Sequence, residues 1–500
     1  MPLTLSRRNL LAIGAGTLAA PLLPGAARAA TPVTLTAGRR TLEVDGRAAT
    51  VFGLTQPDGT AGLFTEVGTP FRVTLKNDAG APTLIHWHGL EPPYRQDGVP
   101  GISGPAIGPG STASYDFPLT FSGTFWMHSH QGLQEQSLLS APLIVRDQSA
   151  ADRQEVVLML HDFSFRSPQD IYASLRGAAN SPQGQSMDEA SAMAGNHMQG
   201  MTMATPASGA MNAMPGMAMG QSADAGPAGM AMDLNDVLYD AFLANDRTLA
   251  DPEVVRVEPR GRILLRVINA SASSNFQIDL GQTQARLVAV DGRPVQPVTG
   301  SVFPVAIAQR LDLAFELATD QTVVPVLATL EGERKRTGIV LATADGRVAK
   351  LADTAPGATE PLNFKLEQRL RAAVSLPPRP ADRVHQVDLT GSMAGYVWGL
   401  NGRVYGQDKP LMVAEGQRVE LVMTNRTPMS HPMHLHGHAF QVVAIDGQRF
   451  GGAVRDTVLV PPMQAVTVPF DAVNPGRWAF HCHNLYHMEA GMMTTLQYET

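Results

Sequence analysis

The sequence has little of several features that mark large classes of protein. It contains one cysteine, Cys482, among 500 residues, so no internal disulfide can form. Charged residues make up 17% against about 25% on average, and no lysine- and arginine-rich run predicts a nucleic-acid surface. After the N-terminus, the chain lacks the roughly 18 consecutive apolar residues of a membrane-spanning helix. Nucleic acid is therefore not expected as a partner, nor a membrane once the N-terminal segment has been removed.

Turn-forming residues, in contrast, are abundant. The 500 residues include 47 glycines and 37 prolines, which favours a turn-rich β protein over a helical one. The chain is also longer than an ordinary domain of about 100 to 200 residues. Two to four hydrophobic cores are therefore expected.

One strand-like pattern of alternating apolar residues occurs three times, and each copy ends in an asparagine. The copies are residues 71–77, 262–269 and 418–425. Frequent turn dipeptides, such as Asn401-Gly402, favour antiparallel Greek-key sandwiches. We therefore expect an all-β protein with three related β-sandwich domains. Their expected bounds are 30–150, 151–355 and 356–500.

The N-terminus has the pattern of an export signal. Arg7-Arg8 precedes an apolar segment, and Ala27-Arg28-Ala29 has the small residues of a cleavage site. The paired arginines favour the twin-arginine route. We therefore expect residues 1–29 to be a signal peptide and the mature protein to be periplasmic.

Residues 187–232 form a low-complexity insertion that contains 11 of the 23 methionines. Thioether sulfur is a soft ligand that suits Cu(I), so the segment is a candidate site for that ion. The alternative is a tolerated surface loop with no metal-binding role.

Ten of the 14 histidines lie in four short motifs. The motifs are His86-Trp87-His88, His128-Ser129-His130, His431 with His434 and His436, and His481-Cys482-His483 with His487. Residues two apart in a strand point to the same face, so each His-x-His pair can present two imidazoles side by side. His86 and His434 each lie nine residues after a repeat asparagine, and His88 and His436 lie eleven residues after it. The same two positions after the middle asparagine hold Ile278 and Leu280. We therefore expect the first and third domains to meet and to place eight imidazoles in one cavity, enough for about three metals.

Cys482 points to the opposite face of its strand from His481 and His483. It can form a second site with His431 and His487, and with Met492 as a weak axial ligand, which is the arrangement of a blue copper centre. The peptide that joins Cys482 to its two neighbouring histidines would then be a short path for electrons. A lone buried cysteine is more often a small apolar residue, so this interpretation rests on the four motifs together.

These residues and motifs resemble the three-domain multicopper oxidases, the group of laccases, ascorbate oxidase and bacterial cuprous oxidases. The resemblance covers the mature chain apart from the insertion, and it implies three cupredoxin-like Greek-key domains and four copper ions per chain. It implies one type 1 copper at His431, Cys482, His487 and axial Met492, one type 2 copper at His86 and His434, and two type 3 coppers at His88, His128 and His483 and at His130, His436 and His481.

The resemblance implies a reaction that takes four electrons singly from a reductant and reduces dioxygen to two waters. The reaction also needs protons, so carboxylates matter. Asp97 matches a proton-supplying position of the family, and Glu489 is a weaker candidate. Asp456 is expected to order a loop instead. His161, His385 and His438 are expected to be structural.

The physiological reductant is less constrained, and a cuprous oxidase active in copper tolerance is the first hypothesis. It is supported by axial Met492, by Met429 and by the insertion. Candidate substrate-copper ligands in the insertion are Met198, Met201, Met203, Met214, Met217 and Met219. However, Thr427 replaces a carboxylate of the cuprous oxidases, and the insertion lies in the middle domain rather than the third. The alternatives are a laccase-like oxidase of phenols and a non-catalytic copper-binding or structural relative. A monomer is expected in each case.

Overall fold

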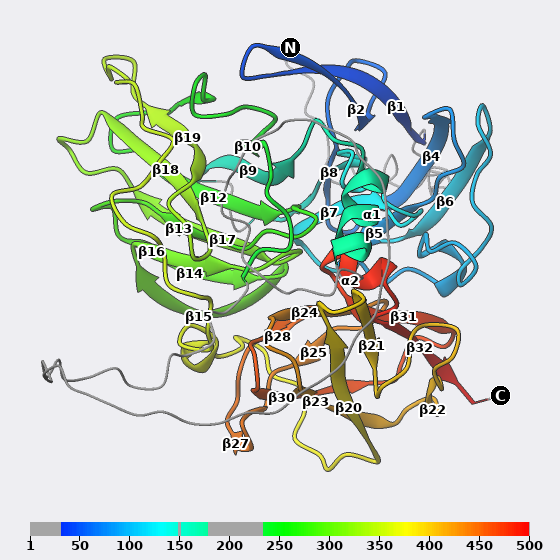
Figure 1. The fold of residues 1–500 in the computed structure, drawn as a ribbon. Helices are drawn as coiled ribbons and strands as arrows, with labels where there is room; N and C mark the ends of the chain where they lie inside the picture. Colours follow the sequence, from blue (N-terminus) through cyan, green and yellow to red (C-terminus); the bar gives the residue numbers. More distant parts are fainter. Residues whose placement is uncertain (1–31, 149–151, 179–233, 500) are drawn as a thin grey trace, which may run out of the picture.

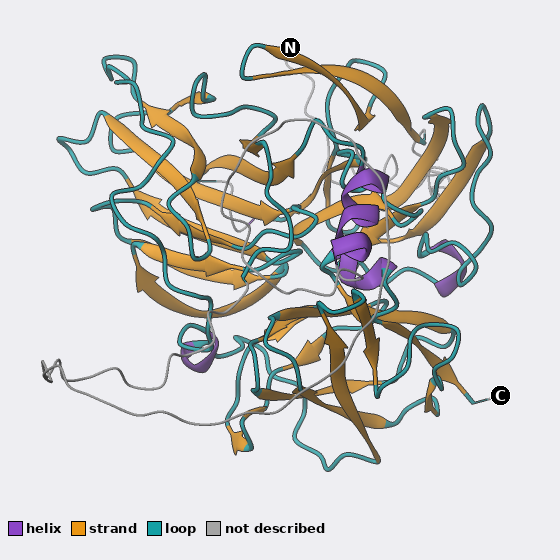
Figure 2. Ribbon diagram, in the orientation of Figure 1, coloured by secondary structure: helices purple, strands orange, loops and turns teal. Residues whose placement is uncertain are grey.

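The computed structural model describes residues 32–148, 152–178 and 234–499, and these residues are mostly strands (Figure 2). The strands form three sandwiches of two main sheets each, which Figure 1 shows side by side in blue to cyan, green, and yellow to red. The expected signal peptide and the methionine-rich insertion lie outside the described residues. Among the described residues, no helix has the length and apolar character needed to cross a membrane.

The first sandwich consists of two four-stranded sheets, β2-β1-β4-β6 and β3-β8-β7-β5. Its elements are β1 (Val33–Val44), β2 (Arg47–Thr55), β3 (Leu63–Glu66), β4 (Pro70–Asp78), β5 (Ile85–His88), the 3-10 helix η1 (Tyr94–Gln96), β6 (Thr112–Pro118), β7 (Gly123–Ser129) and β8 (Ser140–Arg146).

The second sandwich pairs the six-stranded sheet β10-β9-β12-β17-β14-β15 with the five-stranded sheet β11-β19-β18-β13-β16. Its elements are β9 (Gln154–Phe163), α1 (Pro168–Ala178), β10 (Ala241–Ala244), β11 (Val254–Arg256), β12 (Arg262–Asn269), β13 (Phe276–Asp279), β14 (Ala285–Val290), β15 (Arg293–Gly300), β16 (Val302–Val305), β17 (Arg310–Glu316), β18 (Val323–Leu330) and β19 (Arg336–Ala342). The 3-10 helix η3 (Glu367–Arg369) lies in the connection to the third sandwich.

The third sandwich pairs the sheet β21-β20-β23-β30-β26-β27 with the sheet β22-β32-β31-β24-β29, and β25-β28 forms a small extra sheet. Its elements are β20 (Arg383–Ser392), β21 (Val397–Leu400), β22 (Leu411–Val413), β23 (Arg418–Asn425), β24 (His431–Leu435), β25 (Phe440–Gln441), β26 (Ala444–Ile445), β27 (Gln448–Arg449), β28 (Val454–Arg455), β29 (Thr457–Val460), β30 (Ala465–Asp471), β31 (Arg477–Cys482), α2 (Leu485–Glu489) and β32 (Met493–Tyr498).

The sheets are mixed rather than wholly antiparallel, and the prediction was wrong in this respect. β1 pairs with β4 in parallel, and the same arrangement recurs between β9 and β12 and between β20 and β23. In the first sandwich the chain passes from β2 to β3 in the other sheet before β4 returns beside β1. That crossing between sheets makes the returning strand run in the same direction as the first, because it is not joined to it by a hairpin.

The three repeat asparagines perform the same structural task. Asn77, Asn269 and Asn425 end β4, β12 and β23 or lie one residue before the end, and each is fully buried. Each side-chain oxygen accepts from the backbone N–H two residues later, and each side-chain nitrogen donates to carbonyls of the following loop. An unpaired buried backbone group is costly, so the asparagine fixes the loop that follows its strand. In the first and third sandwiches that loop leads to the histidine strands.

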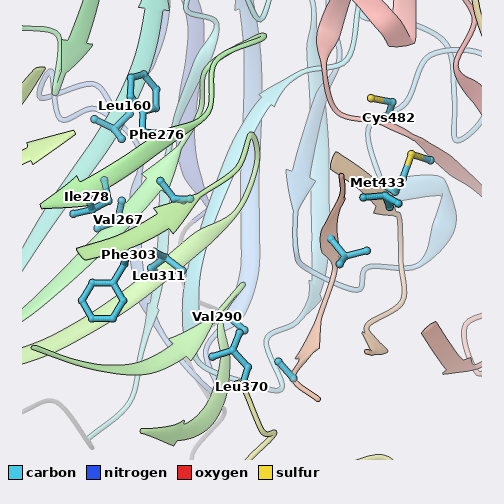
Figure 3. Close-up of a cluster of buried hydrophobic side chains, with 14 of the residues drawn as sticks. Leu160, Val267, Phe276, Ile278, Val290, Phe303, Leu311, Leu370, Met433 and Cys482 are labelled. Atoms are coloured by element: carbon cyan, nitrogen blue, oxygen red, sulfur yellow. The ribbon is translucent and has the colours of Figure 1, made fainter. Parts of the chain in front are cut away.

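The apolar core is divided unevenly among the sandwiches. One buried cluster runs through the second and third sandwiches, whereas the first has a separate cluster between its own sheets. Figure 3 shows part of the larger cluster, with Cys482 and Met433 apart from Leu160, Phe276 and their neighbours. The shared core holds the second and third sandwiches together, and three smaller buried apolar clusters join the first sandwich to them.

Candidate metal centres

The strands of the first and third sandwiches present their histidines in the same way. β5 and β7 are antiparallel neighbours, and their register places His86 opposite His128. β24 and β31 are likewise antiparallel, with His434 opposite His481. Because side chains alternate between faces, His88 follows His86 onto one face of its sheet. Two equivalent strand pairs therefore carry the expected histidine framework.

The eight imidazoles of these two frameworks meet between the first and third sandwiches. The rings of His88 and His434 stack with centroids 3.8 Å apart. Nε2 of His481 lies 3.3 Å from Nε2 of His130 and 3.0 Å from Nε2 of His436. All eight side chains are buried. We call this set the histidine cluster; its members are His86, His88, His128, His130, His434, His436, His481 and His483.

The cluster contains three groups of imidazoles whose nitrogen atoms lie within 4.8 Å of one another. The groups are His86 with His88 and His434, His88 with His128 and His483, and His130 with His436 and His481. The structure thus brings together the two triplets that the resemblance assigns to type 3 coppers, and the pair that it assigns to type 2 copper.

The donor atoms of the cluster are suited to metal ions. Buried ring nitrogens that face the cluster have no hydrogen-bond partner, namely Nδ1 of His88 and Nε2 of His86, His128, His434 and His483. Burial is the main cause that lowers the pKa of most cluster histidines, and that of His130 falls to about 3. Neutral imidazoles with free lone pairs bind copper well, whereas buried unpaired polar atoms otherwise cost free energy.

Two carboxylates contact the outer nitrogens of the cluster. Oδ2 of Asp97 lies 2.8 Å from Nδ1 of His436, and the Asp97 carbonyl accepts from Nδ1 of His86. Oε2 of Glu135 lies 2.7 Å from Nδ1 of His128. Burial raises the pKa of Glu135 well above its ordinary value, and Asp162 adds to this effect. Sequence reasoning identified Asp97 but missed Glu135, because Glu135 belongs to a loop with no metal motif of its own.

Asp456 also belongs to this site, which the sequence interpretation did not recognise. Its Oδ1 lies 3.1 Å from Nε2 of His88, and its carbonyl accepts from Nδ1 of His434. Arg310 forms a bidentate ion pair with the same carboxylate. The Arg310 guanidinium holds the pKa of Asp456 well below its usual range, against the opposing effect of burial. Asp456 was expected to order a loop, and that role stays a prediction beside these contacts with the cluster.

Cys482 lies on the opposite side of β31, with two further imidazoles. Its Sγ is 3.7 Å from Nδ1 of His431 and 3.8 Å from Nδ1 of His487, and these two nitrogens are 3.1 Å apart. Asn484 caps α2 by accepting from the N–H groups of Tyr486 and His487. This cap fixes the start of the helix that carries His487. Burial raises the pKa of the Cys482 thiol. We call His431, Cys482 and His487 the cysteine site.

Met492 is fully buried beside the cysteine site. Its carbonyl accepts from the N–H of Cys482, and its own N–H donates to the carbonyl of His487. These bonds tie its backbone to two of the three residues of the site. The axial role of its sulfur stays a prediction.

The outer nitrogens of the cysteine site have polar partners of different charge. Oγ1 of Thr427 lies 2.7 Å from Nε2 of His431. Oδ2 of Asp236 lies 2.9 Å from Nε2 of His487, and both side chains are fully buried. Burial opposes ionisation of Asp236, but its interaction with His487 and the hydrogen bonds that it accepts lower the pKa of that carboxyl. Sequence reasoning missed Asp236, which is separated from His487 by about half the chain and has no motif around it.

The remaining candidates lie at the margins of these sites or outside the described residues. Glu489 borders a surface cavity of about 370 Å³ that reaches His130, and burial raises the pKa of its carboxyl. Met429 is buried, and its carbonyl accepts from Asn425 and Thr427. Met198, Met201, Met203, Met214, Met217 and Met219 lie outside the described residues.

Three histidines outside the two sites have hydrogen-bond partners of their own. His161 pairs with Ser140, His385 with the carbonyl of Met412, and His438 with Tyr498. These contacts are in accord with the structural roles expected for them.

Three family models described as multicopper oxidase match the chain, over residues 58–150, 155–338 and 378–500. Multicopper oxidase MmcO of Mycobacterium tuberculosis is 31% identical over 442 residues, which cover 86% of this chain and 80% of the relative. A copper resistance protein A homolog of Pseudomonas syringae pv. tomato is 26% identical, and the match covers 94% of this chain and 92% of the homolog. Among solved structures, the laccase of Botrytis aclada has a TM-score of 0.71 at 21% identity. The match covers 93% of this chain and 86% of the laccase chain. This last likeness shows the fold, so the three sandwiches are cupredoxin-like.

Proposed function

The chain belongs to the multicopper oxidase family, whose members are oxidoreductases that use dioxygen, and on this basis we propose that it oxidises Cu(I) in copper tolerance. The family binds copper, and the two sites fit that metal. The histidine cluster contains buried nitrogens without hydrogen-bond partners, and the cysteine site brings a thiol and two imidazoles within 4.8 Å of one another. Relatives named for copper resistance support the choice of reductant.

We assign four coppers to the described residues. His431, Cys482 and His487 would hold the type 1 copper, with Met492 as a further, weak ligand. His86 and His434 would hold the type 2 copper; His88, His128 and His483 would hold one type 3 copper, and His130, His436 and His481 the other. Bound copper would supply one-electron transfer at the cysteine site and reduction of dioxygen to water at the histidine cluster.

The chain supplies the connection between the two sites. Cys482 of the cysteine site is bonded through its backbone to His481 and His483 of the histidine cluster. The parity of β31 sends the thiol to one side and His481 to the other. No rearrangement is needed to link the sites, because neighbouring residues of one strand belong to both.

The chain also places carboxylates where protons are needed. Asp97 lies 2.8 Å from Nδ1 of His436, and Glu135 lies 2.7 Å from Nδ1 of His128. We assign proton supply to Asp97 and add Glu135, which burial keeps protonated more readily than an ordinary glutamate. Glu489 stays a weaker candidate, because it lies at the rim of the cavity that reaches His130.

The choice of Cu(I) over a phenol is carried by one observation, the enclosure of His487. Its side chain is fully buried, Asp236 covers its outer nitrogen, and the ring of Trp398 lies 4.1 Å from its own. A laccase-like reaction calls for an open organic pocket beside this histidine. A buried carboxylate at the same position instead attracts a small cation.

The described residues that flank the insertion in the sequence also support Cu(I). The sequence placed the insertion in the middle domain, away from the cysteine site, but described residues on both sides of it lie beside that site. Before the insertion, Tyr172 of α1 stacks on Tyr486 of α2 with centroids 6.4 Å apart, and Figure 1 shows the two helices next to each other. After it, Asp236 contacts His487. We therefore keep its methionines as candidate Cu(I) ligands that deliver the ion to Asp236.

The alternative function is oxidation of phenols, which the likeness to a laccase structure supports. Oxygen consumption with Cu(I) and with a dimethoxyphenol, each with and without added Cu(II), separates the two. We expect faster consumption with Cu(I), and phenol oxidation only when copper is added. Copper-independent oxidation of the phenol at the higher rate would contradict the proposal.

We also propose that residues 1–29 direct export by the twin-arginine route. Detection of the mature protein in a periplasmic fraction tests this proposal.

A further inference from the structure

Arg310 is a buried arginine of the second sandwich that contacts all three sandwiches. Its side chain is fully buried at the start of β17. Nε donates to the carbonyl of Thr124 in the first sandwich, 3.2 Å away, and Nη1 donates to Ala308 in the second. Nη1 and Nη2 both donate to the carboxylate of Asp456 in the third. A buried charge is tolerated only when it is paired and hydrogen-bonded in this way.

The carboxylate held by Arg310 contacts the histidine cluster. Oδ1 of Asp456 receives Nη1 of Arg310 at 2.8 Å and lies 3.1 Å from Nε2 of His88. Thr457 donates to the same oxygen at 2.8 Å. Gly89 has a φ of 90°, and a Cβ there would collide with Arg310 and Asp456, so the backbone after His88 is packed directly against the pair. The position of Asp456 therefore depends on Arg310, and that of His88 on both.

His88 is oriented differently from its neighbours in the cluster. His86, His434 and His436 turn Nδ1 outward, to Asp97 or Asp456, and Nε2 toward the cluster. His88 turns Nε2 outward to Asp456 and leaves Nδ1 facing the cluster. The Asp456 carboxylate accepts a hydrogen bond from His88 only when Nε2 carries the hydrogen, so this contact selects the tautomer with a free lone pair at Nδ1.

We propose that Arg310 is a positioning residue for the histidine cluster: by holding Asp456, it keeps His88 in the orientation that presents Nδ1 to copper. The inference rests on the proposed copper assignment but not on the choice of reductant. It gives the second sandwich, which contributes no ligand to either site among its described residues, a part in building the cluster.

Arg266 provides a matched control. It is also a buried arginine of the second sandwich, and it pairs with Glu155 and Asp312 while Nη1 donates to Oγ1 of Thr124 in the first sandwich. Its side-chain hydrogen bonds go to Glu155, Thr124 and Asp312, and none of these residues is a cluster histidine or a carboxylate that contacts one. Arg266 therefore has the role of a buried clamp between sandwiches without the link to His88.

The test compares copper binding in R310M, R310K and R266M. Each purified protein is stripped of copper, reloaded, and titrated with a chelator, while the visible absorption of the cysteine site serves as an internal reference. Loss of an outer partner of a metal ligand typically lowers affinity by about 10- to 100-fold. We expect that loss for cluster copper in R310M, a smaller loss in R310K, and an unchanged cysteine-site absorption in both. R266M should have a lower melting temperature but wild-type affinity.

A double-mutant cycle with D456N tests the route. If Arg310 acts through Asp456, D456N should weaken cluster copper as much as R310M does, and the double variant should be no weaker than either. Additive effects, or equal losses in R310M and R266M, would overturn the inference. Should R310M fail to fold, R310K and D456N carry the same comparison. A wild-type protein with fewer than four coppers would instead refute the copper assignment itself, whatever Arg310 does.

Discussion

The second sandwich and the third are built from the same repeat but contribute differently to the two sites. In the third, β24 places His434 opposite His481 of β31, whereas in the second, β13 places Ile278 opposite Ala328 of β18. Both strands follow a buried asparagine that fixes its loop in the same way. The same backbone framework therefore forms with or without the histidines, and a few side chains decide whether a sandwich can bind metal.

The second sandwich and its connections still affect both sites from outside. Asp236, from the segment before β10, contacts His487 of the cysteine site, and Arg310 of β17 contacts Asp456 beside the histidine cluster. Both side chains are fully buried. A sandwich without ligands can therefore influence the metal sites through the partners of their ligands.

The largest effect is expected from Cys482→Ser, which makes the third sandwich match the first, where Ser129 stands at this position. The variant should lose its intense thiolate absorption and its oxidase activity with every reductant, because the route from the cysteine site to the cluster begins at the thiolate. Copper analysis should show that cluster copper is retained. Appreciable activity in C482S would show that electrons enter elsewhere.

A pair of reciprocal variants tests the comparison directly. His434→Ile gives β24 the residue of β13, and should remove copper from the cluster and abolish dioxygen reduction while leaving the cysteine-site absorption. Ile278→His makes the reverse change, and should lower the free energy of unfolding by about 1 to 3 kcal/mol because a buried imidazole has no partner there. The copper content of I278H should not rise. An extra copper in I278H would contradict the view that neighbouring strands must supply further histidines.

Acid should destabilise the metal-free protein. Burial lowers the pKa of seven cluster histidines and of His431, so below about pH 6.5 the unfolded chain takes up protons that the folded protein excludes. Stability is therefore full above that pH and falls as the pH drops, by up to about 1.4 kcal/mol per pH unit for each such histidine. Melting temperatures between pH 7 and 5 measure this fall. A metal-free protein as stable at pH 5 as at pH 7 would contradict it.

Asp236→Asn should have a smaller and selective effect. Removing the charge beside His487 should lower kcat/KM for Cu(I) by about tenfold, the lower end of the range for partners of metal ligands. Oxidation of a dimethoxyphenol should change little. Asp240→Asn is the control, because Asp240 is exposed and its carboxylate accepts hydrogen bonds from Ser164 and Phe165, which lie outside both sites. Equal losses of kcat/KM with both reductants would show that Asp236 supports the cysteine site in general and has no specific role in the oxidation of Cu(I).

The sequence was sufficient to predict the parts of the sites that lie within short motifs. Strand parity separated Cys482 from His481 and His483, and the repeat offsets paired His86 with His434. The contacts of Glu135, Asp236, Arg310 and Asp456 with the two sites were missed for a common physical reason. Asp236, Arg310 and Asp456 meet their partners across a sandwich boundary. Glu135 meets His128 from the loop after β7. Such contacts depend on how the loops and sandwiches pack rather than on any local pattern. The parallel strand pairs were missed likewise, because they follow from crossings between sheets.

The most direct test of the account is the copper content of the purified protein together with its visible spectrum. Four coppers per chain, with the intense absorption of one thiolate-bound copper that disappears in C482S, would agree with a cysteine site joined through its own backbone to a histidine cluster. Fewer than four coppers in the fully loaded protein, or no thiolate absorption, would contradict it.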